Sequence, residues 1–326
     1  MGKIFAIVST ILGAIIGAGF STGQEIFYFF SRFKEKSFLY IFFSSILIFL
    51  ILLYFVDIRI KSRIILMVFK SYILLFSVIT LIVMFSAFGQ LGKDFLGVSR
   101  HIFTLLCFVL SVAIFKHGLL AVVNINKVVI SILIITIVFI FLQALHKNEI
   151  LTQFESLKFH LQKDILNHLI FPLLYSTYNS LLAFPVVNGL KQRFRQKEIK
   201  VSIIISSILI FWLLSIINTM LLSKSSILNT QMPLLIVEKN IILKLILVTC
   251  AFLEILTTIL ANYMGLSYSI KNSKAEFVII IISLLLGFNE FQALLRKLYS
   301  LMGFIGLGII AMLLLSTLLL KDRRLK

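Results

Sequence analysis

The chain has 326 residues, of which 60% are hydrophobic and only 13% are charged, and its mean hydropathy is +1.10. A soluble domain has about a quarter of its residues charged, so most of this surface must face something other than water. The formal net charge of +18 comes from Lys and Arg in short clusters between apolar runs, which is typical of membrane-protein loops. We therefore expect an all-α polytopic membrane protein that contacts the lipid bilayer and binds no nucleic acid.

Apolar runs recur along the whole chain without a polar block long enough for a soluble domain. A helix needs about 20 apolar residues to cross a bilayer, and this criterion predicts about ten transmembrane helices in a single domain over residues 1–326. The ninth run is the shortest. The predicted helices cover residues 4–31, 37–56, 64–90, 101–119, 124–145, 165–190, 200–222, 241–270, 275–288 and 291–319.

Loop charge predicts the orientation of these helices. The densest basic cluster contains five Lys and Arg residues within residues 191–200. With ten helices, this cluster lies on the same side as the N-terminus, and that side carries more Lys and Arg in total. Because cytoplasmic loops are enriched in these residues, we expect both termini to lie in the cytoplasm.

The first apolar run has an unusual glycine content. A glycine costs about 1 kcal/mol relative to alanine inside a helix, and four fall within residues 13–23. Close helix packing through a G-x-x-x-G pair explains the first two, but not the others or the polar residues that follow. Backbone that is not helical survives at membrane depth only where a cavity or protein satisfies it, so we predict an interrupted helix. The glycines are Gly13, Gly17, Gly19 and Gly23.

The sixth run contains two prolines, Pro172 and Pro185, on either side of the polar segment Tyr175–Ser180. Each proline removes a helical hydrogen bond, and polar side chains in mid-membrane are costly unless they line a cavity or bond a neighbour. We predict a second interruption here. The alternative is a proline-kinked helix whose hydroxyls bond back to its own backbone.

The two irregular runs begin near residues 4 and 165, about half the chain apart, and each opens a set of five helices. An odd-numbered unit that is repeated once inserts with opposite topology, as in many secondary transporters. The sequence therefore predicts a five-plus-five inverted repeat over residues 4–145 and 165–319.

Two motifs resemble a known family. The residues GAGFSTGQEI at 17–26, followed by FFSRF at 29–33, are similar to the opening of the YkvI family, and YNSLLA at 178–183 resembles its sixth helix. These bacterial membrane proteins belong to the amino acid–polyamine–organocation superfamily, which has the leucine-transporter fold. The resemblance implies a multi-pass protein of the bacterial inner membrane that transports a small solute.

The resemblance also implies an ion site. In sodium-coupled members of this fold, one sodium ion lies between carbonyls of the broken first helix and a hydroxyl pair on the eighth. The matching groups here are the carbonyls of Gly13 and Ile16 and the hydroxyls of Thr257 and Thr258. Ordinary hydrogen bonds within the eighth helix are the alternative for the two threonines. The coupling ion is expected to be Na⁺ or H⁺, with no other cofactor.

Two carboxylates deserve separate interpretation. Glu254 lies deep in the eighth run and shares a helix face with Thr257 and Thr258. An intramembrane carboxylate is a functional candidate, and Glu254 could pair with a cation or carry a proton. A structural hydrogen bond made by the neutral acid is the alternative. Glu25 is expected nearer the outer vestibule, where a solvated carboxylate opposite Arg32 and a functional role are both open interpretations.

The solute is expected between the two predicted interruptions. A helix that restarts near Gly19–Gly23 would present unpaired N–H groups with about half a positive charge, which suits an anionic group. A mostly apolar pocket with few polar groups suits a small amino acid better than a sugar. The candidate substrate-binding residues are Ala14, Gly17, Ala18, Gly19, Ser21, Thr22, Tyr175, Ser176, Tyr178 and Asn179.

The sequence thus predicts a secondary transporter of an amino acid or similar small organic solute, coupled to a cation. A ligand receptor or sensor that keeps the transporter fold without net transport is the alternative. The chain contains no G-x-x-x-x-G-K-S/T loop and no H-E-x-x-H motif, so neither ATP-driven pumping nor an enzymatic activity is expected.

Overall fold

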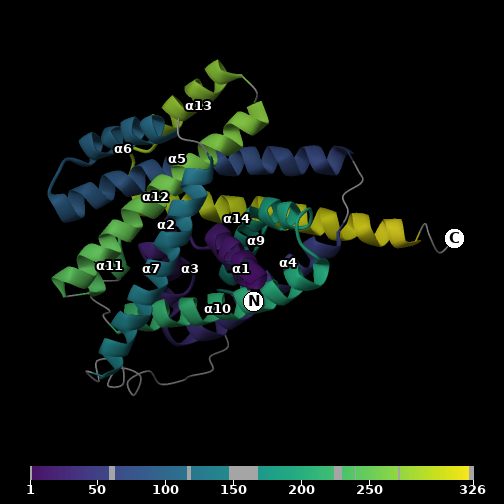
Figure 1. The fold of residues 1–326 in the computed structure, drawn as a ribbon, viewed down its shortest axis with the longest axis horizontal. Coiled ribbons are helices and arrows are strands. Elements are labelled where there is room, and N and C mark those ends of the chain that lie inside the picture. Colours follow the sequence, from purple (N-terminus) through teal and green to yellow (C-terminus); the bar gives the residue numbers. More distant parts are fainter. Residues whose placement is uncertain are drawn as a thin grey trace.

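A computed structural model describes residues 2–58, 63–115, 119–146, 168–223, 230–238, 240–270 and 272–322. These residues form helices and their connections, without a strand (Figure 1). In chain order the elements are α1 (Gly2–Ile15), α2 (Ala18–Ser21), α3 (Gln24–Phe29), the 3₁₀ helix η1 (Ser31–Lys36), α4 (Ser37–Asp57), α5 (Arg63–Leu96), α6 (Arg100–Phe115), α7 (Leu119–His146), α9 (Ile170–Leu190), α10 (Gln196–Leu222), α11 (Pro233–Val237), α12 (Ile241–Ile270), α13 (Ser273–Leu286) and α14 (Phe291–Asp322).

Seven helices within the described ranges are long and apolar enough to cross a membrane, namely α4, α5, α7, α9, α10, α12 and α14. The protein is therefore an all-helical, multi-pass membrane protein. The other three predicted spans are shorter than the roughly 20 residues that a bilayer requires. The first is divided among α1, α2 and α3, and α6 and α13 have 16 and 14 residues. The count of ten and the inverted repeat stay predictions.

The first apolar run is three short helices. Helix α1 ends at Ile15, α2 has only four residues, and α3 begins at Gln24. Gly23 joins α2 to α3 with a positive φ of 75°, and a β-carbon there would lie 2.7 Å from the Leu234 side chain. Both features require glycine, because a side chain at this position would be strained and would overlap α11.

The predicted interruption of the sixth helix is wrong, because α9 is continuous from Ile170 to Leu190. The side chains of Ser176, Thr177 and Asn179 each donate to the carbonyl four residues earlier, at 2.6, 2.7 and 3.0 Å. Pro172 lies in the first turn of α9, where a backbone N–H would have no acceptor within the helix, so the missing donor costs nothing. The polar segment therefore follows the alternative reading, in which hydroxyls bond back to the helix. Its predicted start at residue 165 lies outside the described residues.

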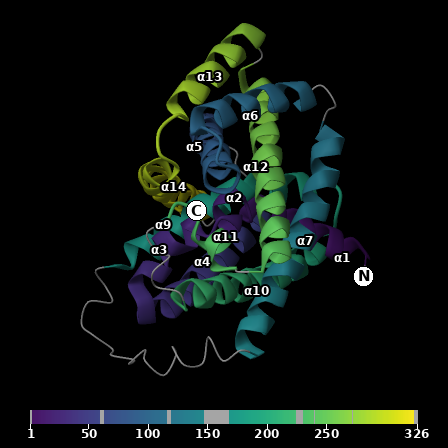
Figure 2. The ribbon, with the colours of Figure 1, turned by 90° about the vertical axis from the view of Figure 1, so that its left-hand side faces the viewer.

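Two helices enclose the divided first run. Helix α9 contacts α1, α4 and α14, while α12 packs against α2, α5 and α7 (Figure 1, Figure 2). Helix α1 also packs on α10 and α7. The end of α1 and the short α2 therefore lie among the long helices, where a non-helical backbone is shielded from lipid.

The basic cluster at residues 191–200 lies at the same end of the bundle as the end of α4. Lys200 forms a salt bridge of 2.9 Å with Asp57, and the Lys191 ammonium donates to the Ile58 carbonyl at 3.2 Å. The salt bridge is exposed, so its contribution to stability is small. It nevertheless places two loops that were both predicted to be cytoplasmic beside each other.

Candidate functional site

A cavity of about 360 Å³ lies where α1 ends. Its walls come from α1, the Ile16–Gly17 connection and helices α3, α5, α7, α9, α12 and α14. Side chains that are far apart in the sequence thus converge on one small space. Eight of the predicted site residues line it: Gly13, Ala14, Ile16, Gly17, Tyr178, Asn179, Thr257 and Thr258.

The cavity has a partly exposed end and a buried one. Ala261 of α12 is exposed, and Leu182 and Val186 of α9 are half-buried, whereas Tyr178 and Glu25 are buried. Since α9 runs from Tyr178 toward its end at Leu190, the open end of the cavity faces the side that carries the basic cluster at residues 191–200.

The other predicted substrate residues do not line this cavity. Ser176 donates to the carbonyls of Pro172 and Ser44, at 2.6 and 3.2 Å, and so ties α9 to α4. The Tyr175 ring packs on Phe29 and Phe30, and its hydroxyl is buried without a hydrogen-bond partner among the residues described. Ala18 begins α2, but its side chain lies outside what the structure describes.

Ser21 and Thr22 are also buried away from the cavity. The Thr22 carbonyl accepts from the Leu234 N–H at 3.0 Å, and its hydroxyl donates to the Gly19 carbonyl at 3.2 Å. Gln24 follows, and in the amide orientation that suits its neighbours it bonds Gln231 and Gln292 at 3.2 and 3.1 Å. The joint between α2 and α3 is therefore docked on the segment that contains α11.

Glu25 occupies the buried end of the cavity, so the expectation of a solvated vestibule position is wrong. It is 5% exposed, and its Oε2 atom accepts a hydrogen bond of 3.1 Å from the Tyr178 hydroxyl. Its carboxyl also lies against the backbone of Gly19, where a β-carbon would overlap it. Arg32 points elsewhere, with its guanidinium 4.3 and 4.1 Å from the ring centroids of Tyr28 and Phe171.

Three aromatic rings surround this end of the cavity. Phe76 stacks on Tyr178 with centroids 6.1 Å apart and an interplanar angle of 20°. The Tyr299 ring lies 5.3 Å from that of Tyr178 and 6.0 Å from that of Phe76. All three residues line the cavity together with Glu25. Phe76 and Tyr299 were not predicted, because single aromatic residues within the apolar runs of α5 and α14 do not stand out from the core.

Glu254 is the second buried carboxylate, and it does not line the cavity. It is 1% exposed, and the Ser21 side chain of α2 interacts with it electrostatically. Neither carboxyl oxygen makes a hydrogen bond of ordinary geometry within the described residues. An ionised carboxylate buried without an opposite charge costs several kcal/mol, so this position calls for a proton or a cation.

The four residues of the predicted ion site line the same cavity. The Thr257 hydroxyl donates to the Glu254 carbonyl at 3.1 Å, as the alternative reading anticipated, but its oxygen keeps lone pairs for a cation. An all-oxygen donor set of carbonyls and hydroxyls fits a hard monovalent ion such as sodium. Over the described part of the chain, no three His, Cys, Asp or Glu residues cluster as a metal site.

No protein-family model matches the chain, and no curated protein matches its sequence. The residues that surround the cavity are therefore the basis for a functional assignment.

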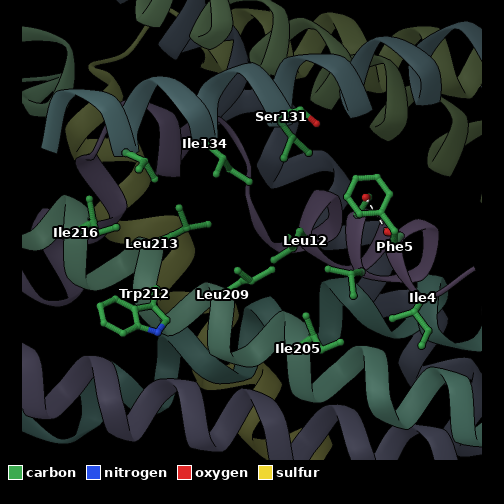
Figure 3. Close-up of a pocket in the computed structure, with 14 residues that line it drawn as sticks. Ile4, Phe5, Leu12, Ser131, Ile134, Ile205, Leu209, Trp212, Leu213 and Ile216 are labelled. Atoms are coloured by element: carbon green, nitrogen blue, oxygen red, sulfur yellow. Dashed lines mark hydrogen bonds between the residues drawn. The ribbon is translucent and has the colours of Figure 1, made fainter. Parts of the chain in front are cut away.

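A second cavity of about 560 Å³ lies between α1, α7 and α10. Figure 3 shows apolar side chains from these three helices pointing into a common space. Phe5 and Trp212 at its border are 71% and 59% exposed. Nearly all of its lining is apolar, so it lacks the convergent polar groups that orient a solute. It lies beside the first cavity, with which it shares Ser9 and Ile130.

Proposed function

We propose that the protein is a secondary transporter of an amino acid or similar small organic solute, which binds in the cavity at the end of α1. One observation carries the proposal: a small cavity, with polar groups from several helices, lies beside a non-helical stretch of backbone among apolar, membrane-length helices. Solute sites of secondary transporters lie near the bilayer midplane, beside discontinuous helices. The likeness of residues 17–33 and 178–183 to the YkvI family agrees with this assignment and with a five-plus-five repeat.

The size and lining of the cavity support a small solute. Ligand sites of small molecules occupy about 300–1,000 Å³, and this one is near the lower limit. Asn179, Thr80 and Thr258 contribute polar groups from three different helices. The non-helical residues Ile16 and Gly17 add backbone groups at the same place. A solute with two or three polar atoms on a short carbon chain matches this lining.

Transport in this proposal is coupled to Na⁺ or H⁺. The carbonyls of Gly13 and Ile16 with the hydroxyls of Thr257 and Thr258 would hold sodium. Glu254 supports the proton alternative, because an ionised carboxylate buried without an opposite charge costs several kcal/mol. Its neighbour Ser21 belongs to α2, so a change in the charge of Glu254 would act on the segment that restarts the first helix.

The proposed setting is the bacterial inner membrane, with both termini in the cytoplasm. Supporting this orientation, the cluster at residues 191–200 packs beside Asp57 and Ile58, and positive loops face the cytoplasm. The open end of the cavity then faces the cytoplasm as well.

The test is uptake by the purified protein in proteoliposomes. Thermal-shift screening first identifies a ligand, and accumulation of that ligand is then measured with an imposed sodium gradient, an imposed pH gradient, or neither. We expect accumulation that depends on one of the two gradients. Ligand binding without accumulation under any gradient would instead favour the receptor or sensor.

A double substitution separates the two coupling ions. Replacing both Thr257 and Thr258 by Ala should abolish sodium-driven uptake if these hydroxyls bind sodium. The matched control is Thr136→Ala, since the Thr136 hydroxyl also bonds within its own helix, to the Ile132 carbonyl at 2.8 Å, but does not line the cavity. Uptake driven by a pH gradient and indifferent to sodium would reject the sodium site and leave proton coupling.

A further inference from the structure

The buried end of the cavity combines one carboxyl with three aromatic rings. Among the described residues that line the cavity, Glu25 is the only acidic one, and no Lys, Arg or His accompanies it. The one hydrogen bond to its carboxyl in this part of the structure comes from the Tyr178 hydroxyl, at 3.1 Å. A neutral donor satisfies one oxygen but does not balance a negative charge.

The protein holds this carboxyl in a defined place. Gly19 lies against one side of it, so closely that a β-carbon would overlap the side chain, and Tyr178 contacts it from α9. A carboxyl fixed between two elements loses little freedom when a ligand binds, which favours recognition. The glycine at residue 19 therefore serves the placement of Glu25 rather than a turn.

The charge of the site favours a cation. An ionised carboxylate at a buried position costs several kcal/mol unless an opposite charge accompanies it. Rings of Tyr and Phe attract a cation that lies over their faces within about 6 Å, and such rings are a common means of binding ammonium groups. Phe76, Tyr178 and Tyr299 provide three such rings, which contact one another and line the same cavity as Glu25.

We propose that Glu25 is the counter-ion for the solute, and that the cavity takes small molecules that carry an ammonium group. The ammonium group binds between the Glu25 carboxyl and the rings of Phe76, Tyr178 and Tyr299. This inference rests on the proposed function, because it concerns the same cavity. It reverses the expectation of an anionic group near Gly19–Gly23, since a solute carboxylate there would meet the Glu25 carboxyl. An amino acid would bind with its ammonium end toward Glu25.

The test uses simple probes and one reporter cysteine. Ala261→Cys places a thiol at the exposed end of the cavity, and its labelling by a hydrophilic maleimide is measured in detergent. The native Cys107 and Cys250 are buried and stay unlabelled. Ethylammonium and tetramethylammonium are compared with propionate and with neutral propionamide at equal concentration. We expect at least one of the two cations to slow labelling, and propionate and propionamide to have no effect.

A substitution then assigns the effect to Glu25. Glu25→Gln keeps the size of the side chain but removes its charge. The affinity for the cation that protects against labelling should fall by about tenfold or more, as expected for a lost charge-assisted contact. Glu290→Gln is the matched control, because Glu290 is exposed and does not line the cavity. Should Glu25→Gln fail to fold, Phe76→Leu provides a second measurement and should also weaken protection by the cation.

The outcomes separate this inference from the proposed function. Protection by propionate, or by neither cation, overturns the inference and leaves transport of another solute open to the uptake assay. An equal response of wild type and Glu25→Gln to the cations overturns it as well. Protection by a cation that is lost in Glu25→Gln supports the inference, even if no uptake into vesicles follows and the transporter assignment fails.

Discussion

The two buried carboxylates of this protein have similar exposure but different surroundings. Glu25 is 5% exposed and Glu254 is 1% exposed. Glu25 lines a cavity, accepts a hydrogen bond from Tyr178 and lies against a glycine. Glu254 is enclosed between α12 and α2, with the Ser21 side chain beside it, and its two oxygens make no hydrogen bond of ordinary geometry among the described residues.

This difference suggests two separate tasks. A carboxyl that lines a cavity can meet a solute, and its defined position suits recognition. A carboxyl that is enclosed by protein can exchange only a proton or a small ion, and only when the elements around it move. Because Glu254 lies on α12 and its neighbour Ser21 lies on α2, such an exchange would be linked to the packing of those two helices.

The largest expected effect is on uptake, and it distinguishes the residue that binds the solute from the residue that couples transport to protons. Glu254→Gln removes the titratable group, so accumulation driven by a pH gradient should be abolished while ligand affinity changes by less than about twofold, a shift of less than ~0.5 kcal/mol. Glu25→Gln should instead weaken ligand binding itself, by about tenfold or more. Binding by thermal shift and uptake by proteoliposomes are measured for both variants. Full pH-driven accumulation in Glu254→Gln would remove Glu254 from the coupling step.

The second effect is a difference in stability between two matched variants. Glu254→Met removes a buried carboxyl whose oxygens make no hydrogen bond of ordinary geometry among the described residues and fills the site with a flexible apolar side chain, so it should stabilise the protein by about 1–3 kcal/mol. Glu25→Met also removes a buried carboxyl, but it leaves the Tyr178 hydroxyl without its acceptor, so it should be the less stable of the two variants by about 1–3 kcal/mol. Thermal unfolding in detergent, without ligand, compares the two. An equal change in Tm for both variants would mean that the two carboxyls are structurally equivalent.

Composition and hydropathy were enough to predict the all-α membrane fold, because the need for apolar surface and internally bonded backbone leaves few alternatives. Local polar content was a poorer guide. The segment Tyr175–Ser180 resembles an interruption, but Ser, Thr and Asn side chains can bond the carbonyl one turn earlier, and here they do so within a continuous α9. The spacing of polar residues in the sequence does not distinguish an interrupted helix from a continuous helix whose side chains bond back to its backbone.

The sequence predicted the site residues that lie on continuous helices, but not the residue whose position depends on a turn. Asn179, Thr257 and Thr258 lie on continuous helices and line the cavity as predicted. Glu25 was misplaced because the φ of 75° at Gly23 sets the course of α3 relative to Gly19, and linear spacing contains no such information. The one available signal was Gly19, a glycine six residues before Glu25 in an apolar run, which leaves room for the carboxyl.

The third prediction tests the glycine that holds Glu25. Gly19→Ala introduces a β-carbon where the carboxyl now lies, and the end of the flexible Glu25 side chain must move away from Tyr178. Affinity for the ammonium probe should fall by about tenfold, or ~1.4 kcal/mol. Gly189→Ala is the matched control, since a β-carbon there meets nothing within 4 Å.

A double-mutant cycle sharpens this result. If Gly19 acts through Glu25, adding Gly19→Ala to Glu25→Gln should cost little further affinity, because the two changes remove one interaction. Additive losses would mean that residue 19 affects the cavity by another route.

The smallest expected effect concerns the hydroxyl that bonds Glu25. Tyr178→Phe keeps the ring beside Phe76 and Tyr299 but removes the donor to the Glu25 carboxyl, now 3.1 Å away. One hydrogen bond contributes about 0.5–1.5 kcal/mol, so ligand affinity should fall by no more than about tenfold, and less than in Glu25→Gln.

The matched control is Tyr175→Phe, because the Tyr175 hydroxyl is buried without a partner among the described residues and lies outside the cavity. Its loss should leave affinity unchanged and should, if anything, stabilise the fold. Thermal-shift titration with the ammonium probe measures both variants. An affinity that falls as far in Tyr175→Phe as in Tyr178→Phe would show that the polar character of α9, and not a specific bond to Glu25, determines binding.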